Sequence, residues 1–551
     1  MKKLHCISLL FLSAIAIATA QTQTKDTVVT RNVTVEREYV PVVKNAGKIT
    51  STPQGVDPKE IKIEAKYTDF NLPLSIGSNI HTLPPAQLIQ QKKAVKDGFA
   101  QIGLGSYPNT LVDFVYPLVK NPDAQLDFTL NHRGTFGNKP YSKSVANLLF
   151  NKQFYALDFF AGISGGNDYL RYYGKMFEAD ATSETGIKEI SQPLQNDAQT
   201  FWKTGAFLGI KSKDEPYEFQ YRLKAGYDLF NVAGQATENI ANVAAGLSFP
   251  FEDDRIGIDL AFKYLNYDSL KHYNNTILSL NPYYDLLRSD NWSLRLGVKS
   301  VFSFAQGNVV NASPDIRFDW KIIPQNIAFY GGLTGDYAIN SYSQILNENP
   351  YMHPHIRVAD TYAPIELFGG FKLKPFGNFL VDIFANFRYI DNQYFFINQE
   401  NVAGNDTISN RFEALYSTAT HFKSGVRMTY NYQNRLNLQF KGAYNGWDVY
   451  EQDYAWNKPA WEADFSAGFN VTKELAFSLN AFYEGGRYAK LKNKAILMSP
   501  KMDVNIGASY NYLDWLSFFA RINNLFNSKY ENFYGYEVQG LNVMLGASFS
   551  F

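Results

Sequence analysis

The stretch from Met502 to Tyr512 reads MDVNIGASYNY, and it alternates between apolar and polar residues along its whole length. Successive side chains of a β-strand point to opposite faces, so a period of two predicts a strand with one apolar face and one polar face. The same alternation recurs from Trp461 to Phe469, from Phe379 to Tyr389 and from Leu541 to Phe551. The chain is therefore predicted to be all-β.

Strands of this kind fit either a soluble sandwich, which buries its apolar faces, or a membrane barrel, which turns them to lipid. Three features favour the barrel. Many of the alternating segments have about ten residues, the length that crosses a bilayer at a tilt. Tight connections such as 252–254 alternate with long ones such as 336–362 and 486–501. Aromatic residues gather at strand ends, for example at 394–396, as they do in interfacial girdles.

The number of alternating segments indicates the size of the barrel. Between residues 98 and 551 we count about 22 strands, an even number, as in bacterial single-chain barrels. A barrel of this size has a lumen too wide for its wall side chains to fill. We therefore predict a transmembrane antiparallel β-barrel over residues 98–551, surrounded by the lipid of the outer membrane.

The composition agrees with a folded membrane protein. Of 551 residues, 16% are aromatic and 19% are charged. A chain rich in aromatic residues and poor in net charge is not intrinsically disordered. Its 52 basic and 52 acidic residues balance, which argues against nucleic acid as a partner, because phosphate binding needs a basic surplus.

Residues 1–20 have the pattern of an export signal. Lys2 and Lys3 precede an apolar run, and Ala18-Thr19-Ala20 forms a small-residue cleavage site, so we expect cleavage after Ala20. Cys6, the only cysteine, lies within this signal. The mature chain would thus contain no disulfide, thiolate metal site or cysteine nucleophile.

Residues 21–97 precede the predicted barrel and read as an extended segment in the periplasm or the lumen. Prolines recur at positions 41, 53, 58, 73, 84 and 85, and they interrupt any regular sheet. The segment therefore does not have the pattern of a compact domain.

The C-terminal part resembles a known family. The stretch NLFNSKY at 524–530, YGY at 534–536 and the terminal strand ending in Phe551 resemble the last two strands of TonB-dependent receptors. The segments 348–351 and 368–372 resemble receptor-type barrels of the Bacteroidota. The resemblance spans roughly residues 98–551. It implies insertion into the outer membrane, uptake of a nutrient too large for general porins, and a role for Phe551 in the signal that the barrel assembly machinery reads.

The chain departs from the family pattern at its N-terminal side. TonB-dependent receptors carry a plug domain within the barrel, and residues 21–97 are too few and too rich in proline for a full plug. Asp26-Thr27-Val28-Val29-Thr30 resembles the short box that pairs with TonB by strand addition. The alternative interpretation is an extended periplasmic tail without energy coupling.

Charged residues on the polar faces of the predicted strands are expected to face the lumen. On the lipid face an Arg or Lys at mid-membrane would cost about 2–4 kcal/mol. These residues could form a substrate path or anchor the N-terminal segment, or they could be an ordinary solvated lining with ion pairs across the wall. They are Asp259, Lys263, Arg295, Lys299, Asp382, Arg388, Asp464, Asp503 and Arg521.

No motif for catalysis, a cofactor or a metal stands out, and we expect no enzyme. His353-Pro354-His355 could supply two metal ligands, but no carboxylate at ligand spacing adjoins them, and exposed loop histidines are the simpler interpretation. His132 and His421 lie near predicted strands with no nucleophilic Ser marked beside them.

Three hypotheses of function follow. The first is a receptor or channel for solute uptake or binding, with TonB as a partner. The second is an accessory or scaffold barrel that works with surface lipoproteins, the assembly machinery or other outer-membrane proteins. A membrane-embedded hydrolase is a distant third.

Overall fold

The computed structural model describes residues 96–180, 187–190, 198–213, 218–270, 272–289, 291–305, 309–400, 407–492 and 494–551. All of them belong to one compact unit, residues 78–551. The predicted signal at 1–20 and nearly all of the predicted segment 21–97 lie outside the described residues.

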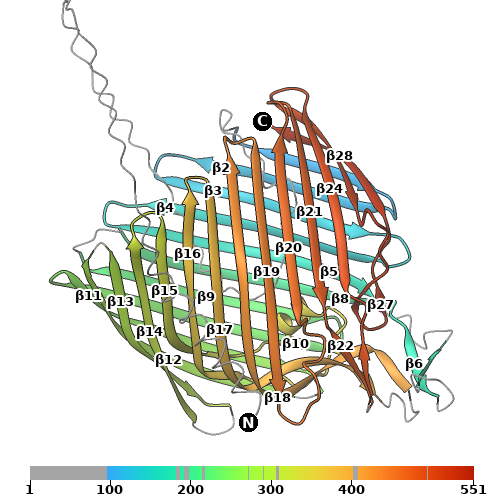
Figure 1. Cartoon of the computed structure of the whole chain (residues 1–551), viewed down its shortest axis with the longest axis horizontal. Helices are drawn as coiled ribbons and strands as arrows, with labels where there is room; N and C mark the ends of the chain where they lie inside the picture. Colours follow the sequence, from blue (N-terminus) through green and yellow to red (C-terminus); the bar gives the residue numbers. More distant parts are fainter. Residues whose placement is uncertain are drawn as a thin grey trace, which may run out of the picture. The chain divides into compact units, whose positions relative to one another are not determined.

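Twenty-two antiparallel strands form a closed barrel (Figure 1). The first strand, β1, pairs with the last strand, β28, from Phe99 opposite Ser550 to Gly105 opposite Met544, and this pairing closes the wall. The predicted all-β fold and strand number are confirmed. The strands of the wall are β1 (Phe99–Gly105), β2 (Asn109–Lys120), β3 (Ala124–Thr135), β4 (Tyr141–Gln153), β5 (Leu157–Arg171), β8 (Ala198–Ser212), β9 (Gln220–Val232), β10 (Ala236–Phe251), β11 (Asp254–Asp268), β12 (Tyr273–Ser289), β13 (Trp292–Ser303), β14 (Val309–Ile323), β15 (Ile327–Ala338), β16 (Thr361–Phe376), β17 (Phe379–Glu400), β18 (Thr407–Tyr432), β19 (Leu436–Val449), β20 (Trp461–Asn470), β21 (Leu475–Gly485), β24 (Lys501–Asn511), β25 (Leu516–Asn523) and β28 (Asn542–Ser550).

Among the described residues, three small hairpins and the helix α2 (Tyr342–Glu348) lie outside the wall. The hairpin β6 (Met176–Ala179) and β7 (Ile187–Ile190) joins the same sheet through β18. The hairpins β22 (Tyr488–Leu491)–β23 (Lys494–Leu497) and β26 (Glu531–Phe533)–β27 (Tyr536–Glu537) form separate small sheets. The helix α2 lies between β15 and β16.

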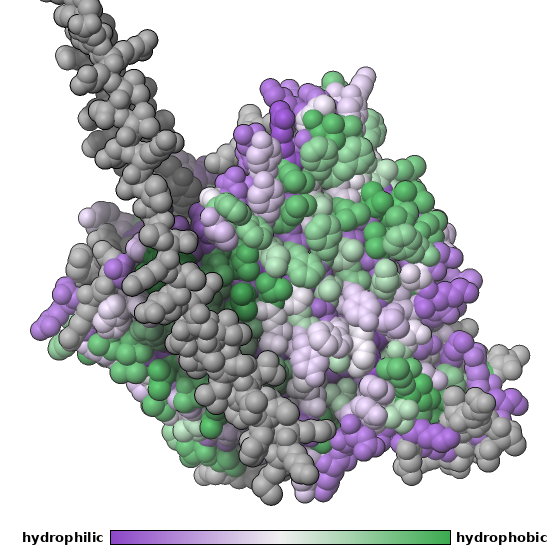
Figure 2. All heavy atoms as spheres, in the orientation of Figure 1, coloured by the Kyte–Doolittle hydropathy of each residue, from purple (hydrophilic) through white to green (hydrophobic). Residues whose placement is uncertain are grey.

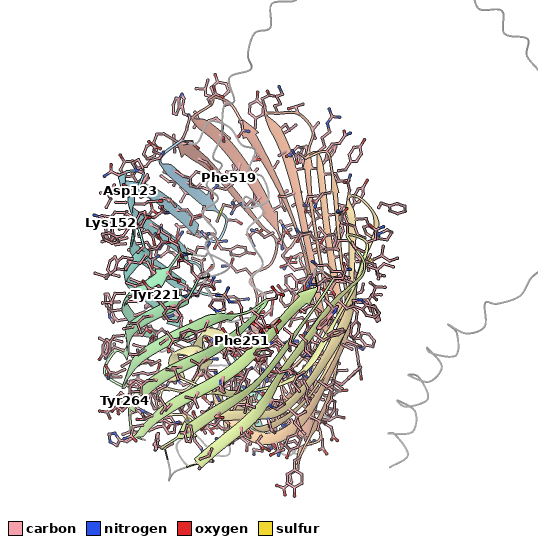
Figure 3. The ribbon with its side chains drawn as sticks, turned by 90° about the vertical axis from the view of Figure 1, so that its left-hand side faces the viewer. Asp123, Lys152, Tyr221, Phe251, Tyr264 and Phe519 are labelled. Atoms are coloured by element: carbon pink, nitrogen blue, oxygen red, sulfur yellow. The ribbon has the colours of Figure 1, made fainter. Side chains whose placement is uncertain are left out.

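The outer face of the wall is apolar. Large aliphatic side chains there are more than half exposed, such as Leu104 at 66%, Ile163 at 60% and Leu545 at 61%. Hydrophobic residues form broad areas on the visible wall (Figure 2). In the view of Figure 3, Tyr264 points away from the barrel and Phe519 lies on its inner side. An apolar outer face with polar residues within is the arrangement of a barrel that spans a bilayer.

The two ends of the barrel differ. The end that holds Phe99 and Ser550 carries tight turns, such as the connection from Phe251 to Asp254, and we call it the turn end. The opposite end, which we call the loop end, carries the long connections 339–360, 450–460, 486–500 and 524–541. The turn from β10 to β11 places Glu252 at φ 54, in the left-handed region that tight turns use.

The C-terminal residue belongs to the closing seam. The amide of Gly98 donates to the Phe551 carbonyl oxygen at 2.7 Å, and the Phe551 amide donates back to Gly98 at 3.0 Å. The Phe551 ring stacks on Tyr116, with ring centroids 5.9 Å apart. Phe551 therefore extends the pairing of β28 with the start of the barrel.

Within the described part of the chain, no helix is long and apolar enough to cross a membrane.

Neighbouring residues of β21 test which face meets lipid. Leu479 lies on the outer face, and Asn480 lies on the inner face between Ser466 and Asn505. We expect Leu479→Arg to lower the free energy of unfolding in lipid vesicles by about 2–4 kcal/mol, because its charge would enter the hydrocarbon. The matched variant Asn480→Arg should lower it by less than about 1 kcal/mol. Equal losses in urea titrations of the two variants would contradict the assignment of faces.

Candidate functional site

Several segments fold inward over the loop end, and we call them the roof. They are residues 339–360 with helix α2, the parts of β17 and β18 at 393–398 and 409–418, residues 172–175, and the hairpin β26–β27. Side chains from these segments share one hydrophobic cluster with inward-facing residues of β8, β9 and β11. Figure 1 shows the end of β18 reaching toward β6. The roof is thus packed against the inner wall.

Helix α2 is held by aromatic packing. Tyr342 is fully buried, its ring stacks on Tyr267 of β11 with centroids 5.3 Å apart, and Phe230 of β9 lies 5.9 Å away. Ile345 is fully buried as well. A helix of this length is not stable alone, so tertiary packing must hold it. Each such side chain contributes about 1.5–3 kcal/mol on burial.

Glu238 of β10 anchors the first turn of α2. Its side chain is 1% exposed and faces the lumen. Its carboxylate accepts hydrogen bonds from the Ser343 amide at 3.2 Å, the Ser343 hydroxyl at 2.5 Å and the Tyr342 amide. Ser341 caps the helix, because its Oγ accepts from the Gln344 amide at 3.1 Å. A buried carboxylate is costly unless it is hydrogen-bonded, so the roof and this position of the wall stabilise each other.

Asp360 anchors the other end of the same segment. Its carboxylate accepts from the Tyr273 hydroxyl at 2.8 Å, from the Tyr337 hydroxyl at 2.7 Å, and from the Asn275 amide group. Burial raises the pKa of Asp360 above its ordinary value, although these hydrogen bonds oppose the shift. The segment 339–360 is therefore fastened to the wall by a carboxylate at each end, the buried Glu238 and the half-buried Asp360.

The bend of β17 into the roof lies beside Asp360. The register of β17 with β18 shifts between Ile390 and Gln393, and Asn392 has φ 59. Asn tolerates this left-handed conformation better than most residues. The Asn392 side chain donates to the Asp360 carbonyl oxygen, and the Thr361 hydroxyl donates to the Asn392 carbonyl oxygen at 2.9 Å. The two largest roof segments thus meet at one point of the wall.

An aromatic junction joins the remaining roof segments. The Tyr351 and Tyr536 rings stack with centroids 3.5 Å apart, and Tyr173 meets Tyr536 edge-on at 5.1 Å. The Tyr536 hydroxyl donates to the Asn410 carbonyl oxygen at 2.6 Å. The Asn410 side chain in turn donates to the Tyr172 carbonyl oxygen at 3.0 Å. Residues 172–175, 339–360, β18 and β27 are linked in this way.

A cavity of about 440 Å³ lies between the roof and the inner wall. This volume falls in the range of ligand pockets. Its lining combines tyrosine rings, carboxamides, three lysines, one arginine and two aspartates, and it comes from the wall strands β4, β5, β8, β24 and β28 together with roof and loop residues. The polar and aromatic lining includes Lys139, Tyr141, Lys143, Asp168, Arg171, Tyr173, Lys203, Asn347, Tyr351, Asp503, Tyr530 and Asn532.

Charges in the cavity are only partly paired. Lys203 forms an ion pair with Asp168 at 2.6 Å and donates to Asn347 at 3.1 Å. Lys139, in the loop before β4, donates to the Val538 carbonyl oxygen at 2.7 Å, and burial lowers its pKa. Asp503 accepts from the Tyr530 hydroxyl at 3.1 Å. The cavity therefore offers both signs of charge.

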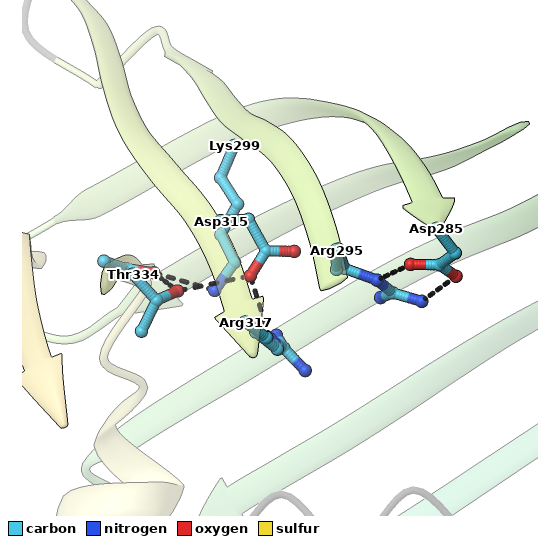
Figure 4. A network of polar contacts seen from close by, with 7 residues as sticks. Asp285, Arg295, Lys299, Asp315, Arg317 and Thr334 are labelled. Carbon is cyan, nitrogen blue, oxygen red and sulfur yellow. Dashed lines mark hydrogen bonds and ion pairs between the residues drawn. The ribbon is translucent and has the colours of Figure 1, made fainter. Parts of the chain in front are cut away.

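The nine charged residues predicted to face the lumen lie on strand faces opposite the exposed apolar ones. Most have partners within the wall. Arg295 pairs with Asp285 at 2.6 Å, Arg388 with Glu366 at 2.9 Å and Asp382 with Arg427 at 3.0 Å. Figure 4 shows Arg295 with Asp285, and Lys299 near Asp315 and Thr334.

The remaining predicted residues are spread around the wall. Lys299 donates to the Gly335 carbonyl oxygen at 2.8 Å, and Arg521 donates to Gln101 at 3.5 Å. Asp259 and Lys263 lie on β11 and Asp464 lies on β20. Of the nine, the structure brings Asp503 to the cavity. The sequence did not single out Lys139, Lys143 or Lys203, because no local pattern marks a cavity whose roof comes from distant segments.

The histidines of the described part of the chain do not gather into a metal site. His353 and His355 lie in the roof with ring centroids 5.3 Å apart. His421 stacks on Trp447 at 3.8 Å, and His132 is hydrogen-bonded to Ser144 at 2.8 Å. Over the described ranges, no group of three or more His, Cys, Asp or Glu could hold a metal ion. Asp26 to Thr30 lie outside the described residues.

Solved structures share the fold of this chain. The ferripyoverdine receptor of the outer membrane of Pseudomonas aeruginosa, bound to ferripyoverdine, is similar with a TM-score of 0.64 and 10% identity, covering 84% of this chain and 72% of that chain. The ferric-catecholate import receptor Fiu from E. coli has a TM-score of 0.62 and 8% identity, covering 83% and 82%. The copper transporter OprC has a TM-score of 0.58 and 11% identity, covering 84% of each chain. No family model and no characterised protein matches the sequence.

Glu238→Ala tests how the roof is held. Its loss removes hydrogen bonds to a charged acceptor, each worth about 1.5–3 kcal/mol, so α2 should open about 10- to 100-fold more often. We expect chymotrypsin cleavage after the buried Tyr342 to accelerate by that factor, as followed by mass spectrometry of the peptides. The matched variant Glu366→Ala removes a lumen carboxylate that pairs with Arg388 in the wall, and it should leave this rate unchanged. Equal acceleration in both variants would contradict the anchoring role.

Proposed function

We propose that the chain is an outer-membrane receptor for solute uptake. The observation that carries the proposal is the cavity of about 440 Å³ that lies between an anchored roof and the inner wall at the loop end. A ligand-sized cavity at the mouth of a wide barrel is suited to binding a solute before it passes the wall. The shared fold with proteins described as a siderophore receptor, an import receptor and a copper transporter supports the same function.

The proposal includes export and energy coupling. Residues 1–20 direct export and are removed after Ala20, and the barrel assembly machinery inserts the chain by way of Phe551. Residues 26–30 pair with TonB, as the resemblance of this stretch implies. The lumen charges that pair within the wall, such as Arg295 and Arg388, line the path below the cavity.

An accessory barrel is the second candidate. The hairpin β6–β7 continues the sheet of the wall beyond its loop end, through the pairing of Thr407 and Ile408 with Glu178 and Phe177. Such a projection suits docking of a surface lipoprotein or another outer-membrane protein. A scaffold would co-purify with its partner in stoichiometric amounts and would not need residues 26–30.

Deletion of residues 26–30 separates the two candidates. For a TonB-coupled receptor, we expect growth on the limiting nutrient to be lost while the amount of barrel in the outer membrane stays the same, because the box acts only in energy coupling. A deletion of equal length at 46–50, elsewhere in the same N-terminal segment, serves as the control. Growth that is unaffected by the first deletion, together with a stoichiometric partner in mild-detergent purification, would support the accessory barrel instead.

Phe551→Ala tests the insertion signal. We expect the amount of folded barrel in the outer membrane to fall severalfold, because the assembly machinery would no longer read the C-terminal residue. Phe549→Ala is the matched control, since Phe549 also lies on the outer face of β28, where it stacks on Trp515 at 6.4 Å. Urea unfolding of both variants refolded in vesicles measures the packing contribution alone. An equal fall for the two variants would show that packing, and not the signal, determines the amount.

A further inference from the structure

We propose that the cavity between the roof and the wall binds a short peptide with a free carboxylate and a free amino group. This inference rests on the proposed receptor function and names the chemical class of its ligand. It follows from charges of both signs on separate parts of the lining, and from carboxamides and tyrosine rings between them.

Lysines form one side of the cavity. Lys143 of β4 faces the lumen with an exposed side chain, and among the described residues it has no ion pair or hydrogen bond. Lys139, in the adjoining loop, donates to a carbonyl oxygen, and no carboxylate of the described chain lies within ion-pair distance of it. A ligand carboxylate can therefore accept charge-assisted hydrogen bonds from both ammonium groups.

A carboxylate forms another side. Asp503 comes from β24, which is separated from β4 along the wall by β25, β28, β1, β2 and β3. Its Oδ2 accepts from the Tyr530 hydroxyl at 3.1 Å, and the residue lines the cavity. A carboxylate oxygen accepts more than one hydrogen bond, so a ligand ammonium group can donate to the same oxygen.

The lining between these charges suits a peptide backbone. The carboxamide of Asn347 accepts from Lys203 through its oxygen, so its amino group is available to donate to a carbonyl oxygen. The side chain of Asn532 can both donate and accept. Tyr173 and Tyr351 add aromatic surface for apolar side chains. An extended pentapeptide, which spans at most about 17 Å, is the probe chosen for this ligand class.

Other ligand classes fit less well. A neutral sugar would make no ion pair with Lys143 or Asp503. An anionic metal chelate would find the lysines but would place negative charge beside Asp503 and Asp168. A zwitterionic peptide matches both signs.

Isothermal titration calorimetry of the full-length protein in nanodiscs tests the inference, with pentaalanine as the probe. We expect pentaalanine to bind, and N-acetyl-pentaalanine and pentaalanine amide each to bind at least about tenfold more weakly, because each lacks one end charge. Lys143→Met should weaken pentaalanine binding about tenfold and leave the amide unaffected. Asp503→Asn should weaken pentaalanine binding about tenfold and leave binding of the acetylated form unaffected. Lys441→Met, a lumen lysine of β19 outside the cavity lining, is the matched control and should change nothing.

Equal binding of all three peptides, no binding of pentaalanine, or preferential binding of maltose would overturn the inference. These outcomes are distinguishable from a failure of the receptor function. If growth on a nutrient still depends on residues 26–30 while pentaalanine does not bind, the receptor function stands and its ligand is not a peptide.

Discussion

Closure of the backbone hydrogen-bond ladder is the constraint on which the rest of the structure depends. A strand within hydrocarbon cannot leave its N–H and C=O groups unpaired, so the sheet must return to its first strand. The pairing of β1 with β28 achieves this, and Gly98 and Phe551 extend it by one step. Because the ladder closes at 22 strands, the lumen is wide, and the chain must bring other segments inward to structure it.

Those segments form the roof, and carboxylates hold it. Glu238 lies on the wall and accepts from roof amides, whereas Asp360 lies at the end of the roof segment 339–360 and accepts from wall tyrosines. Apolar packing of Tyr342 against Tyr267 supplies the remaining attachment. This arrangement turns an open pore mouth into a lined cavity, and the charges left unpaired there, rather than the wall pairs below, define what it can bind.

The wall could be predicted from the sequence because its signal is local. The alternation from Met502 to Tyr512 sets the two faces of β24 through geometry alone. The roof could not be predicted, since its contacts join residues far apart in the chain, such as Tyr351 with Tyr536 and Glu238 with Ser343. The sequence predicts a long polar connection over 336–362, but this stretch contains the helix α2. Asp503 was the one predicted lumen charge that lines the cavity, and nothing in its local sequence separates it from the other eight.

Hydrogen exchange of the native protein in nanodiscs measures the central claim, that the roof is a fixed part of the barrel, most directly. The amides of Tyr342, Ser343, Ile345 and Asn349 donate to Glu238, to Ser341 or within the helix turn. The account predicts that peptides covering residues 339–360 exchange slowly, with protection comparable to that of the neighbouring wall strands β15 and β16. Exchange of this segment as fast as that of an exposed loop would contradict it.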